Sequence, residues 1–199
     1  MTYPFAAMLS RMKYINRWGL MRNTRPESLA EHVTECAVTA HILAALAADE
    51  FGAEDVRPEK VALAALYHDA DEILTGDLPT PVKYRNRGIL GEYKRIEKEM
   101  SETIVKGIPD SISGRIRSAV IADDLTDHEK KIIKAADKLS ALFKCIEEER
   151  SGNQEFGSAK KSTLDKLRQD ILPETQYFMD HFLPCFEMDL DELISQNNN

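Results

Sequence analysis

The pair His68-Asp69 is the feature of this sequence that points most directly to chemistry. It closes the apolar run Ala64-Ala65-Leu66-Tyr67, where an imidazole and a carboxylate without partners would be costly to bury. Adjacent helical residues point about 100° apart, so the two side chains can flank one point in space. Imidazole and carboxylate groups together suit a divalent transition metal. The pair therefore predicts part of a metal site.

Two further residues have the types and surroundings of metal ligands. His32 lies next to the apolar face of an expected helix, and Asp137 is flanked at four-residue spacings by Ile133 and Ala141. An unpaired carboxylate in such surroundings is unfavourable, and a bound cation would remove that cost. The resulting two nitrogens and two oxygens suit one first-row ion such as cobalt, manganese, iron, zinc or nickel, with water in the open positions. The predicted ligands are His32, His68, Asp69 and Asp137.

Glu72 is the candidate for work on a metal-bound water. It follows His68 by four residues and Asp69 by three, so it shares their helical face. A carboxylate beside such a water can orient or deprotonate it. Asp71 is expected to point away from Asp69 and to be exposed.

Ordinary structural roles remain open for each of these residues. A single half-buried histidine is more often a core residue than a ligand, and Glu72 could be a solvated acid at a helix end. Asp137 could pair with Lys138 or Arg11. His41 cannot join the site, because it lies nine residues after His32 and about 180° around the helix.

The elements that must position these side chains are helical nearly throughout, since no clear alternating strand pattern occurs. Two capping boxes, Ser28 with Glu31 and Thr126 with Glu129, predict helix starts, and Pro58 suits a first turn. The sequence therefore predicts an all-α bundle with a frayed polar tail over residues 195–199. The expected helices cover residues 5–16, from 28 through 43, from 58 into 68–69, 90–105, 112–121, 126–151, 156–169 and 174–182.

Composition limits the possible classes of protein. With 199 residues, 43% of them hydrophobic, the chain suits a single domain over residues 1–199. A net charge of −8 argues against nucleic-acid polymers as partners. Three scattered cysteines form no CxxC motif, and no segment has a signal peptide's pattern or the roughly 20 apolar residues of a membrane span. We expect a cytoplasmic protein without a membrane partner.

The ordered set of His32, His68-Asp69 and Asp137 resembles the signature of the HD-domain metal-dependent phosphohydrolases. Within that superfamily the sequence is most similar to the bacterial HD-domain 5′-deoxynucleotidases, nearly over its full length. The most specific part is the loop Thr75-Gly76-Asp77-Leu78-Pro79-Thr80-Pro81. The resemblance implies a compact all-α HD-domain bundle. The matching segments are residues 15–18, 21–23, 31–32, 67–72, 75–84, 134–137 and 153–156.

The resemblance also implies an activity: removal of the 5′-phosphate from deoxyribonucleoside 5′-monophosphates, with a divalent metal, cobalt being favourable, by a homodimer. By this match Arg17 orients the phosphate, Trp18 crowds the sugar and Glu72 acts on the water. The loop residues implied to hold the sugar are Asp77, Leu78, Pro79 and Thr80.

Other interpretations stay open at this stage. Arg17 could stabilise a helix end, Trp18 could be a core residue and Asp77 a turn residue. The chain could be another HD phosphohydrolase, acting on a nucleoside triphosphate or a cyclic dinucleotide. It could also be a non-catalytic helical binding protein with a structural metal.

Overall fold

A computed structural model describes residues 2–83 and 85–197, apart from the side chains of Thr80 and Asn197. Within these ranges every element is helical, and the β pairing consists of one isolated antiparallel bridge, Asn16 with Ser28. The predicted all-α class is confirmed. The α-helices are α1 (Phe5–Leu9), α2 (Leu29–Ala45), α3 (Pro58–Tyr67), α4 (Glu72–Thr75), α5 (Thr80–Lys83), α6 (Arg87–Val105), α7 (Asp110–Ile121), α8 (Asp127–Arg150), α9 (Gly157–Arg168), α10 (Pro173–His181) and α11 (Leu190–Asn197). Shorter 3₁₀ segments cover Ser10–Tyr14, Gln154–Phe156 and Leu183–Glu187, and a π-helical turn covers Leu46–Glu50.

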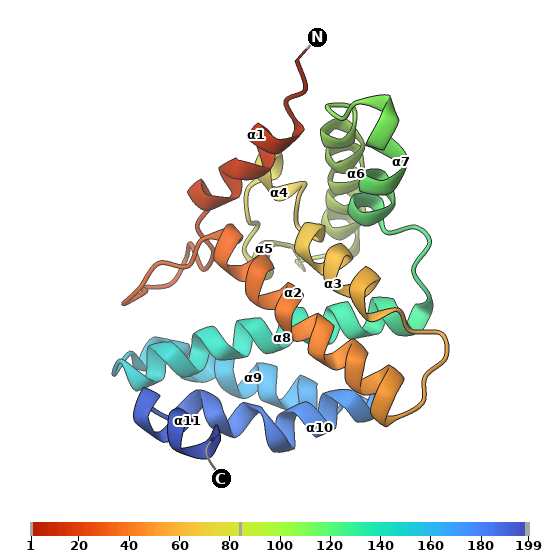
Figure 1. Cartoon of the computed structure of the whole chain (residues 1–199). Coiled ribbons are helices and arrows are strands. Elements are labelled where there is room, and N and C mark those ends of the chain that lie inside the picture. The colour runs from red at the N-terminus through yellow and green to blue at the C-terminus, as the bar shows by residue number, and fades with distance from the viewer. Residues whose placement is uncertain (1, 84, 198–199) are drawn as a thin grey trace.

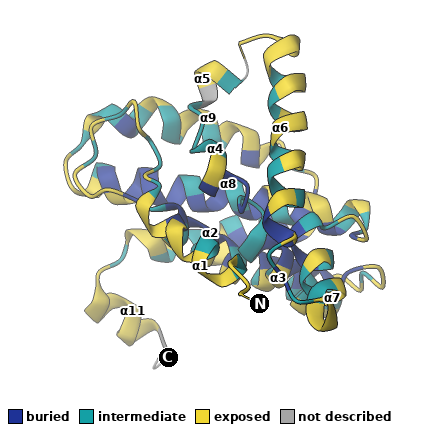
Figure 2. Cartoon of the chain, turned by 90° about the horizontal axis from the view of Figure 1, so that it is seen from above, coloured by how far each residue is buried: buried dark blue, intermediate teal, exposed yellow. Residues whose placement is uncertain are grey.

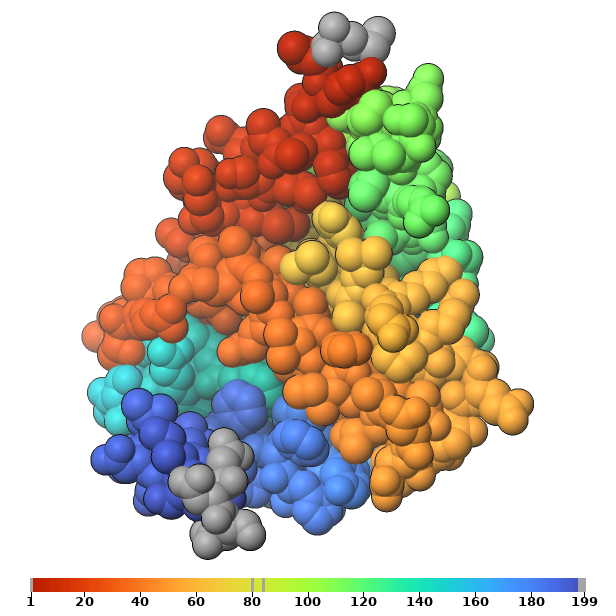
Figure 3. Space-filling view, viewed as in Figure 1, coloured from red at the N-terminus to blue at the C-terminus, as the bar shows by residue number. Residues whose placement is uncertain are grey.

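Helix α2 is the central element of the bundle. It packs against both α3 and α8, while α9 packs on α8 and α10 contacts both α9 and α2 (Figure 1). The surfaces of α2 and α3 form much of one face of the molecule (Figure 3). Two apolar clusters hold these helices together, and α2 contributes to both. Leu29 and Val33 belong to the cluster near α1, α6 and α7, whereas Cys36 and Leu43 belong to the cluster with α8, α9 and α10. His32 therefore stands where the two clusters meet.

Burial follows the same arrangement (Figure 2). The central part of α8 is buried on most of its faces, including Leu139, Ser140 and Phe143, because α2 and α9 both cover it. The charged helix α6 buries little beyond Ile104 and Val105 at its end. Side chains on α2 and α8 are therefore held most firmly by packing.

Both predicted capping boxes are confirmed. Ser28 Oγ accepts from the Glu31 amide at 3.3 Å, and the Glu31 carboxylate accepts from the Ser28 amide at 2.8 Å. Thr126 and Glu129 make the same reciprocal pair at 3.0 and 2.8 Å. The two helices that carry His32 and Asp137 thus start where local sequence fixes them.

The first and third helices end earlier than predicted. Helix was predicted for residues 5–16, but the helical segment stops at Tyr14 because Ile15 is extended and its carbonyl accepts from the Leu29 amide at 2.8 Å. Helix α3 ends at Tyr67, so that His68-Asp69 lies in the following turns. A tertiary contact and a tight turn override the helical pattern in these two places.

Two other boundaries also differ. Helix α6 begins at Arg87 rather than 90, because the Asn86 side chain caps it by accepting from the Ile89 amide at 2.9 Å. The tail predicted to fray from residue 195 is helical to Asn197, since Asp189 and Glu192 form a further capping box. Residues 198–199 lie outside the described part of the chain.

The described helices include none that is both long enough and apolar enough to span a membrane. The single domain over residues 1–199 stays a prediction of the sequence.

A fully buried carboxylate, Glu148, ties α8 to the loop that precedes α2. It accepts from the Thr24 amide at 2.9 Å, from the Thr24 hydroxyl at 2.7 Å and from the Asn153 side chain at 2.7 Å. It also forms an ion pair with the buried ammonium of Lys144. Burial opposes ionisation of Glu148, but these bonds outweigh it and hold its pKa far below the usual range.

We predict that Glu148→Ala lowers the free energy of unfolding by about 3–5 kcal/mol, because it leaves the Lys144 charge buried without its partner. Urea denaturation measures this, with Glu99→Ala, which removes an exposed ion pair with Arg95, as a control that changes stability by less than about 1 kcal/mol. Because folding lowers the pKa of Glu148, its carboxylate stabilises the protein at pH values above the carboxyl pKa of the unfolded chain. The difference in free energy of unfolding between wild type and Glu148→Ala should therefore shrink as the pH falls below that unfolded-state pKa. An unchanged urea midpoint would contradict the prediction.

Candidate metal centre and active site

Three of the four predicted ligands converge closely. His32 on α2, and His68 and Asp69 in the turn after α3, each offer one ligand atom, and these atoms lie within 4.8 Å of one another. The Nε2 atoms of His32 and His68 lie 3.5 and 3.1 Å from the same oxygen of Asp69. Asp137 on α8 joins them, with Oδ1 3.3 Å from His32 Nε2. The fold thus brings together the four residues that the sequence singled out.

Asp137 differs from the prediction of a carboxylate in apolar surroundings. Its side chain is 45% exposed, whereas that of His32 is fully buried. Asp137 lies between the buried residues Ala136 and Leu139 of α8, but its own side chain reaches solvent, so it borders the open side of the cluster. The cluster is therefore closed on the α2 side and accessible beside α8.

The other ring nitrogen of each histidine is held by an acceptor. Ser140 Oγ donates its one hydrogen to Glu35 at 2.7 Å, so it accepts from His32 Nδ1 at 3.0 Å. His68 Nδ1 lies 2.7 Å from the Ala65 carbonyl, which can only accept. In its neutral form each ring thus carries its proton on Nδ1, which leaves the lone pair on Nε2. This is the usual outer arrangement around a metal-ligating histidine.

The two Nε2 atoms are buried and lie 3.1–3.5 Å from carboxylate oxygens, but no contact among the described residues has the geometry of a hydrogen bond to them. Buried polar atoms of this kind are rare, because a lost hydrogen bond is costly. Two aligned lone pairs beside two carboxylates are the donor set of a divalent metal site. The residues present therefore fit such an ion.

The electrostatics of the cluster also favour a cation. Burial disfavours the charged form of His68, yet the nearby Asp69 and Asp137 carboxylates outweigh it and raise its pKa to about 9. Burial also opposes ionisation of Asp69, but the two histidines hold its pKa well below the usual range. The site thus binds positive charge strongly, whether as protons or as a metal ion.

Glu72, at the start of α4, lies beside this cluster as predicted. It is 6% exposed, and its Oε2 has no hydrogen-bond partner among the described residues. Burial, followed by the negative charges of Asp69 and Asp77, raises its pKa to about 9. A carboxyl group in this state can accept or give a proton near neutral pH when its surroundings change.

The prediction that Asp71 is exposed was wrong. It is 6% exposed, and burial together with the Asp69 charge raises its pKa to about 7. The prediction assumed a continuous helix through residue 71, whereas residues 68–71 form successive turns between α3 and α4. The ideal 100° spacing does not apply there.

Arg17 reaches the cluster from the loop before α2. Its Nε donates to Glu27 at 3.2 Å, and its Nη1 lies 3.7 Å from the Asp69 carboxylate. The guanidinium is 13% exposed and therefore nearly fixed in place. It presents its terminal nitrogens at the edge of the candidate metal site.

Trp18 follows in a left-handed backbone conformation, with φ of +58°, which is uncommon for a bulky residue. Its indole nitrogen donates to Glu27 at 2.8 Å, and its ring packs against Phe156 with centroids 5.2 Å apart. Glu27 was missed in the sequence, where it precedes the capping box without any periodic signal. The structure shows its role, because the bridge between Asn16 and Ser28 aligns Glu27 with Arg17 and Trp18, which both donate to its carboxylate.

The loop predicted to hold a sugar borders the same region. Gly76 has φ of +72°, which favours glycine, and its carbonyl accepts from the Tyr93 hydroxyl at 3.2 Å. Asp77, Leu78 and Pro79 are half-buried. The Asp77 charge influences the pKa values of both Glu72 and Arg17, which places it near them. The side chain of Thr80 lies outside the described part of the chain.

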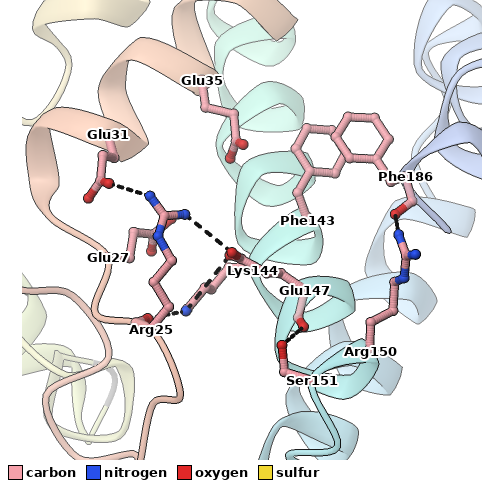
Figure 4. A pocket seen from close by; sticks show the side chains of 10 residues that line it. All are labelled: Arg25, Glu27, Glu31, Glu35, Phe143, Lys144, Glu147, Arg150, Ser151 and Phe186. Carbon is pink, nitrogen blue, oxygen red and sulfur yellow. Dashed lines mark hydrogen bonds and ion pairs between the residues drawn. The ribbon is translucent and has the colours of Figure 1, made fainter. Parts of the chain in front are cut away.

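A cavity of about 540 Å³ lies between the segment over residues 25–35 and the C-terminal half of α8 (Figure 4). Its charged groups largely pair with one another, as Arg25 does with Glu31 and Glu147. None of the predicted site residues lines it, so its size alone does not make it the reaction site. It borders the candidate site only through Glu27 and Glu35.

Comparison with solved structures shows the fold. The chain superposes on an HD-domain phosphohydrolase from Listeria innocua with a TM-score of 0.76 and 23% identity, covering 94% of this chain and 89% of that one. It also matches a cyanophage S-2L HD phosphohydrolase, described as bound to dA and one catalytic Zn²⁺ ion, with a TM-score of 0.62 and 18% identity. That alignment covers 91% and 95% of the two chains. The predicted compact HD-domain bundle is confirmed.

Comparison of sequences is more specific. Residues 4–186 match the family model described as 5′-deoxynucleotidase YfbR-like. The chain is 46% identical to the 5′-deoxynucleotidase YfbR of Escherichia coli O1:K1 / APEC, over 98% of this chain and 96% of the relative. A Klebsiella pneumoniae 5′-deoxynucleotidase shows the same identity and coverage. The resemblance inferred from the sequence is confirmed: this chain belongs to the 5′-deoxynucleotidase YfbR-like family.

Proposed function

We propose that this protein hydrolyses deoxyribonucleoside 5′-monophosphates to deoxynucleosides and phosphate. The observation that carries this proposal is the pair of buried Nε2 atoms of His32 and His68 that lack hydrogen bonds among the described residues. They lie beside the carboxylates of Asp69 and Asp137. Glu72 and Arg17 are close to the same cluster. Membership of a 5′-deoxynucleotidase family supports the substrate class.

One divalent transition metal would be held by His32 Nε2, His68 Nε2, Asp69 and Asp137. When bound, this ion would lower the pKa of a water and of the neighbouring Glu72 and would offset negative charge on the phosphate. We propose cobalt as a favourable ion and manganese or another first-row ion as substitutes, since mixed nitrogen and oxygen ligands accept several of them.

The remaining chemistry falls to side chains of this chain. Glu72 orients the attacking water and takes its proton, while Arg17 binds phosphate oxygens through its terminal nitrogens. Attack on phosphorus in line with the ester oxygen breaks the P–O5′ bond, and the leaving oxygen takes up a proton. Asp77, Leu78, Pro79 and Thr80 hold the sugar. The ring of Trp18 occupies the space beside C2′ and excludes a 2′-hydroxyl.

The assembly and location follow from the family resemblance and the composition. We propose a cytoplasmic homodimer that acts on mononucleotides rather than on nucleic-acid polymers, since the net charge of −8 disfavours binding to a polyanion. Sedimentation equilibrium would test the dimer.

The direct test is phosphate release from a panel of deoxy- and ribonucleoside 5′-monophosphates, with cobalt, with manganese and with chelator. We expect metal-dependent release from the deoxynucleotides, and at least about tenfold less from the ribonucleotides, since a steric clash in a packed site costs about 1–3 kcal/mol. Equal release from both sets would contradict the proposal that Trp18 excludes a 2′-hydroxyl. Release only from triphosphates or cyclic dinucleotides would indicate another HD phosphohydrolase, and none at all would favour a binding protein.

We predict that Glu72→Gln lowers kcat by about 10²–10⁴-fold, the range for loss of a general acid–base group, while stoichiometric metal binding is retained. Steady-state kinetics and metal analysis of the same preparation measure both quantities. Glu59→Gln, which changes an exposed carboxylate on α3, serves as the control with normal kcat. A Glu72→Gln enzyme with near-normal kcat would exclude the assigned role.

Ser140→Ala should lower the affinity for the metal by about 10–100-fold, because His32 loses the acceptor that keeps its proton on Nδ1. Isothermal titration of the metal-free protein with manganese or cobalt measures this without relying on activity. Ser158→Ala, at an exposed position on α9, is the matched control. Equal affinities for the two variants would show that Ser140 does not set the ring orientation.

A further inference from the structure

One carboxylate oxygen joins the two residues assigned to the phosphate and the sugar. Glu27 Oε2 accepts from Arg17 Nε at 3.2 Å and from Trp18 Nε1 at 2.8 Å. The Glu27 side chain is 10% exposed, so neither bond competes much with water. Charge-assisted hydrogen bonds of this kind are about twice as strong as neutral ones.

The backbone reinforces this arrangement. The Arg17 amide donates to the Glu27 carbonyl at 2.9 Å, next to the bridge between Asn16 and Ser28. Glu27 therefore has a fixed register opposite Arg17. The capping box begins at the following residue, so the start of α2 anchors Glu27 from the other side.

The conformation of Trp18 needs such support. A bulky residue in the left-handed region is strained and persists only where its surroundings hold it. Phe156 packs against the ring at an interplanar angle of 58°, while Glu27 accepts from the indole N–H. The apolar contact is not directional, whereas the hydrogen bond fixes the orientation of the indole ring in its plane.

The same bond determines how Arg17 is presented. With Nε engaged by Glu27, the guanidinium directs its Nη1 side toward Asp69, 3.7 Å away. The two terminal nitrogens form the edge that matches two oxygens of a phosphate. Loss of the Nε contact would let this edge rotate away from the metal ligands.

We propose that Glu27 is a positioning residue that fixes Arg17 and Trp18 relative to each other, so that phosphate binding and exclusion of a 2′-hydroxyl are set together. This inference rests on the proposed function, since it assigns the cause of its deoxynucleotide selectivity. Glu27 does not itself touch the substrate. Its removal should therefore change selectivity as well as rate.

Two substitutions and one control test the proposal. Glu27→Ala removes both hydrogen bonds. Glu27→Gln keeps a side chain of the same length with one oxygen that can accept a hydrogen bond, but it removes the negative charge. Glu155→Ala is the control, because Glu155 pairs with Arg22 in the neighbouring loop and adjoins Phe156, yet contacts neither Arg17 nor Trp18 in the described structure.

The first readout does not depend on activity. Trp18 is the sole tryptophan of the chain, so its fluorescence reports this position alone when tyrosine is not excited. We expect Glu27→Ala to shift the emission to longer wavelength and to lower the anisotropy. Glu27→Gln should lie between Glu27→Ala and wild type, and Glu155→Ala should match wild type. Thermal unfolding of each variant verifies that it is folded.

The second readout is kcat/KM for matched deoxy- and ribonucleoside monophosphates. Glu27→Ala should raise KM for the deoxynucleotide by about tenfold, as expected for loss of a charge-assisted hydrogen bond, and should reduce the deoxy-to-ribo ratio of kcat/KM. Glu27→Gln should recover part of both. A general loss of structure would instead lower both rates equally.

Wild-type fluorescence and an unchanged selectivity ratio in folded Glu27→Ala would overturn the proposal. Failure of the proposed function would look different. The wild-type protein would then release no phosphate from deoxynucleotides, while the fluorescence comparison would still show whether Glu27 holds Trp18.

Discussion

The structure depends on one unfavourable feature: two imidazole lone pairs, on His32 and His68, that are buried without hydrogen-bond partners in the described part of the chain. Protein interiors rarely tolerate such atoms, so something in the working molecule must satisfy them. A hydrogen bond donated by Nδ1 holds each ring in place, to Ser140 for His32 and to the Ala65 carbonyl for His68. The packing of α2 against α3 and α8 directs both lone pairs and the Asp69 carboxylate to one point, and places Asp137 Oδ1 3.3 Å from His32 Nε2. The bundle is thus a scaffold for a cation.

The same concentration of negative charge governs the neighbouring groups. Burial first, and the Asp69 charge after it, raise the pKa of Glu72 to about 9 and that of Asp71 to about 7. Arg17 supplies positive charge at the edge of this region, and Glu27 keeps it there. A phosphate ester entering the site would meet a guanidinium and a cation, with a carboxyl group beside them. These are the groups that phosphoryl transfer to water requires.

Local signals explain what could be predicted from the sequence. The capping boxes at Ser28 and Thr126 depend on residues three apart, and the four ligand candidates were recognisable by type and by apolar context. The failures involved tertiary geometry. The burial of Asp71 follows from turns that interrupt the helix, and the contact between Glu27 and Trp18 joins two residues nine positions apart in paired segments. No helical or strand period encodes either contact.

The most direct test of the central claim is a crystal structure with manganese or cobalt and a deoxynucleoside monophosphate, in which anomalous scattering locates the metal. A single peak bound by the Nε2 atoms of His32 and His68, by Asp69 and Asp137 and by a phosphate oxygen would agree with it. Coordination through Nδ1, or a metal bound away from these four side chains, would contradict it.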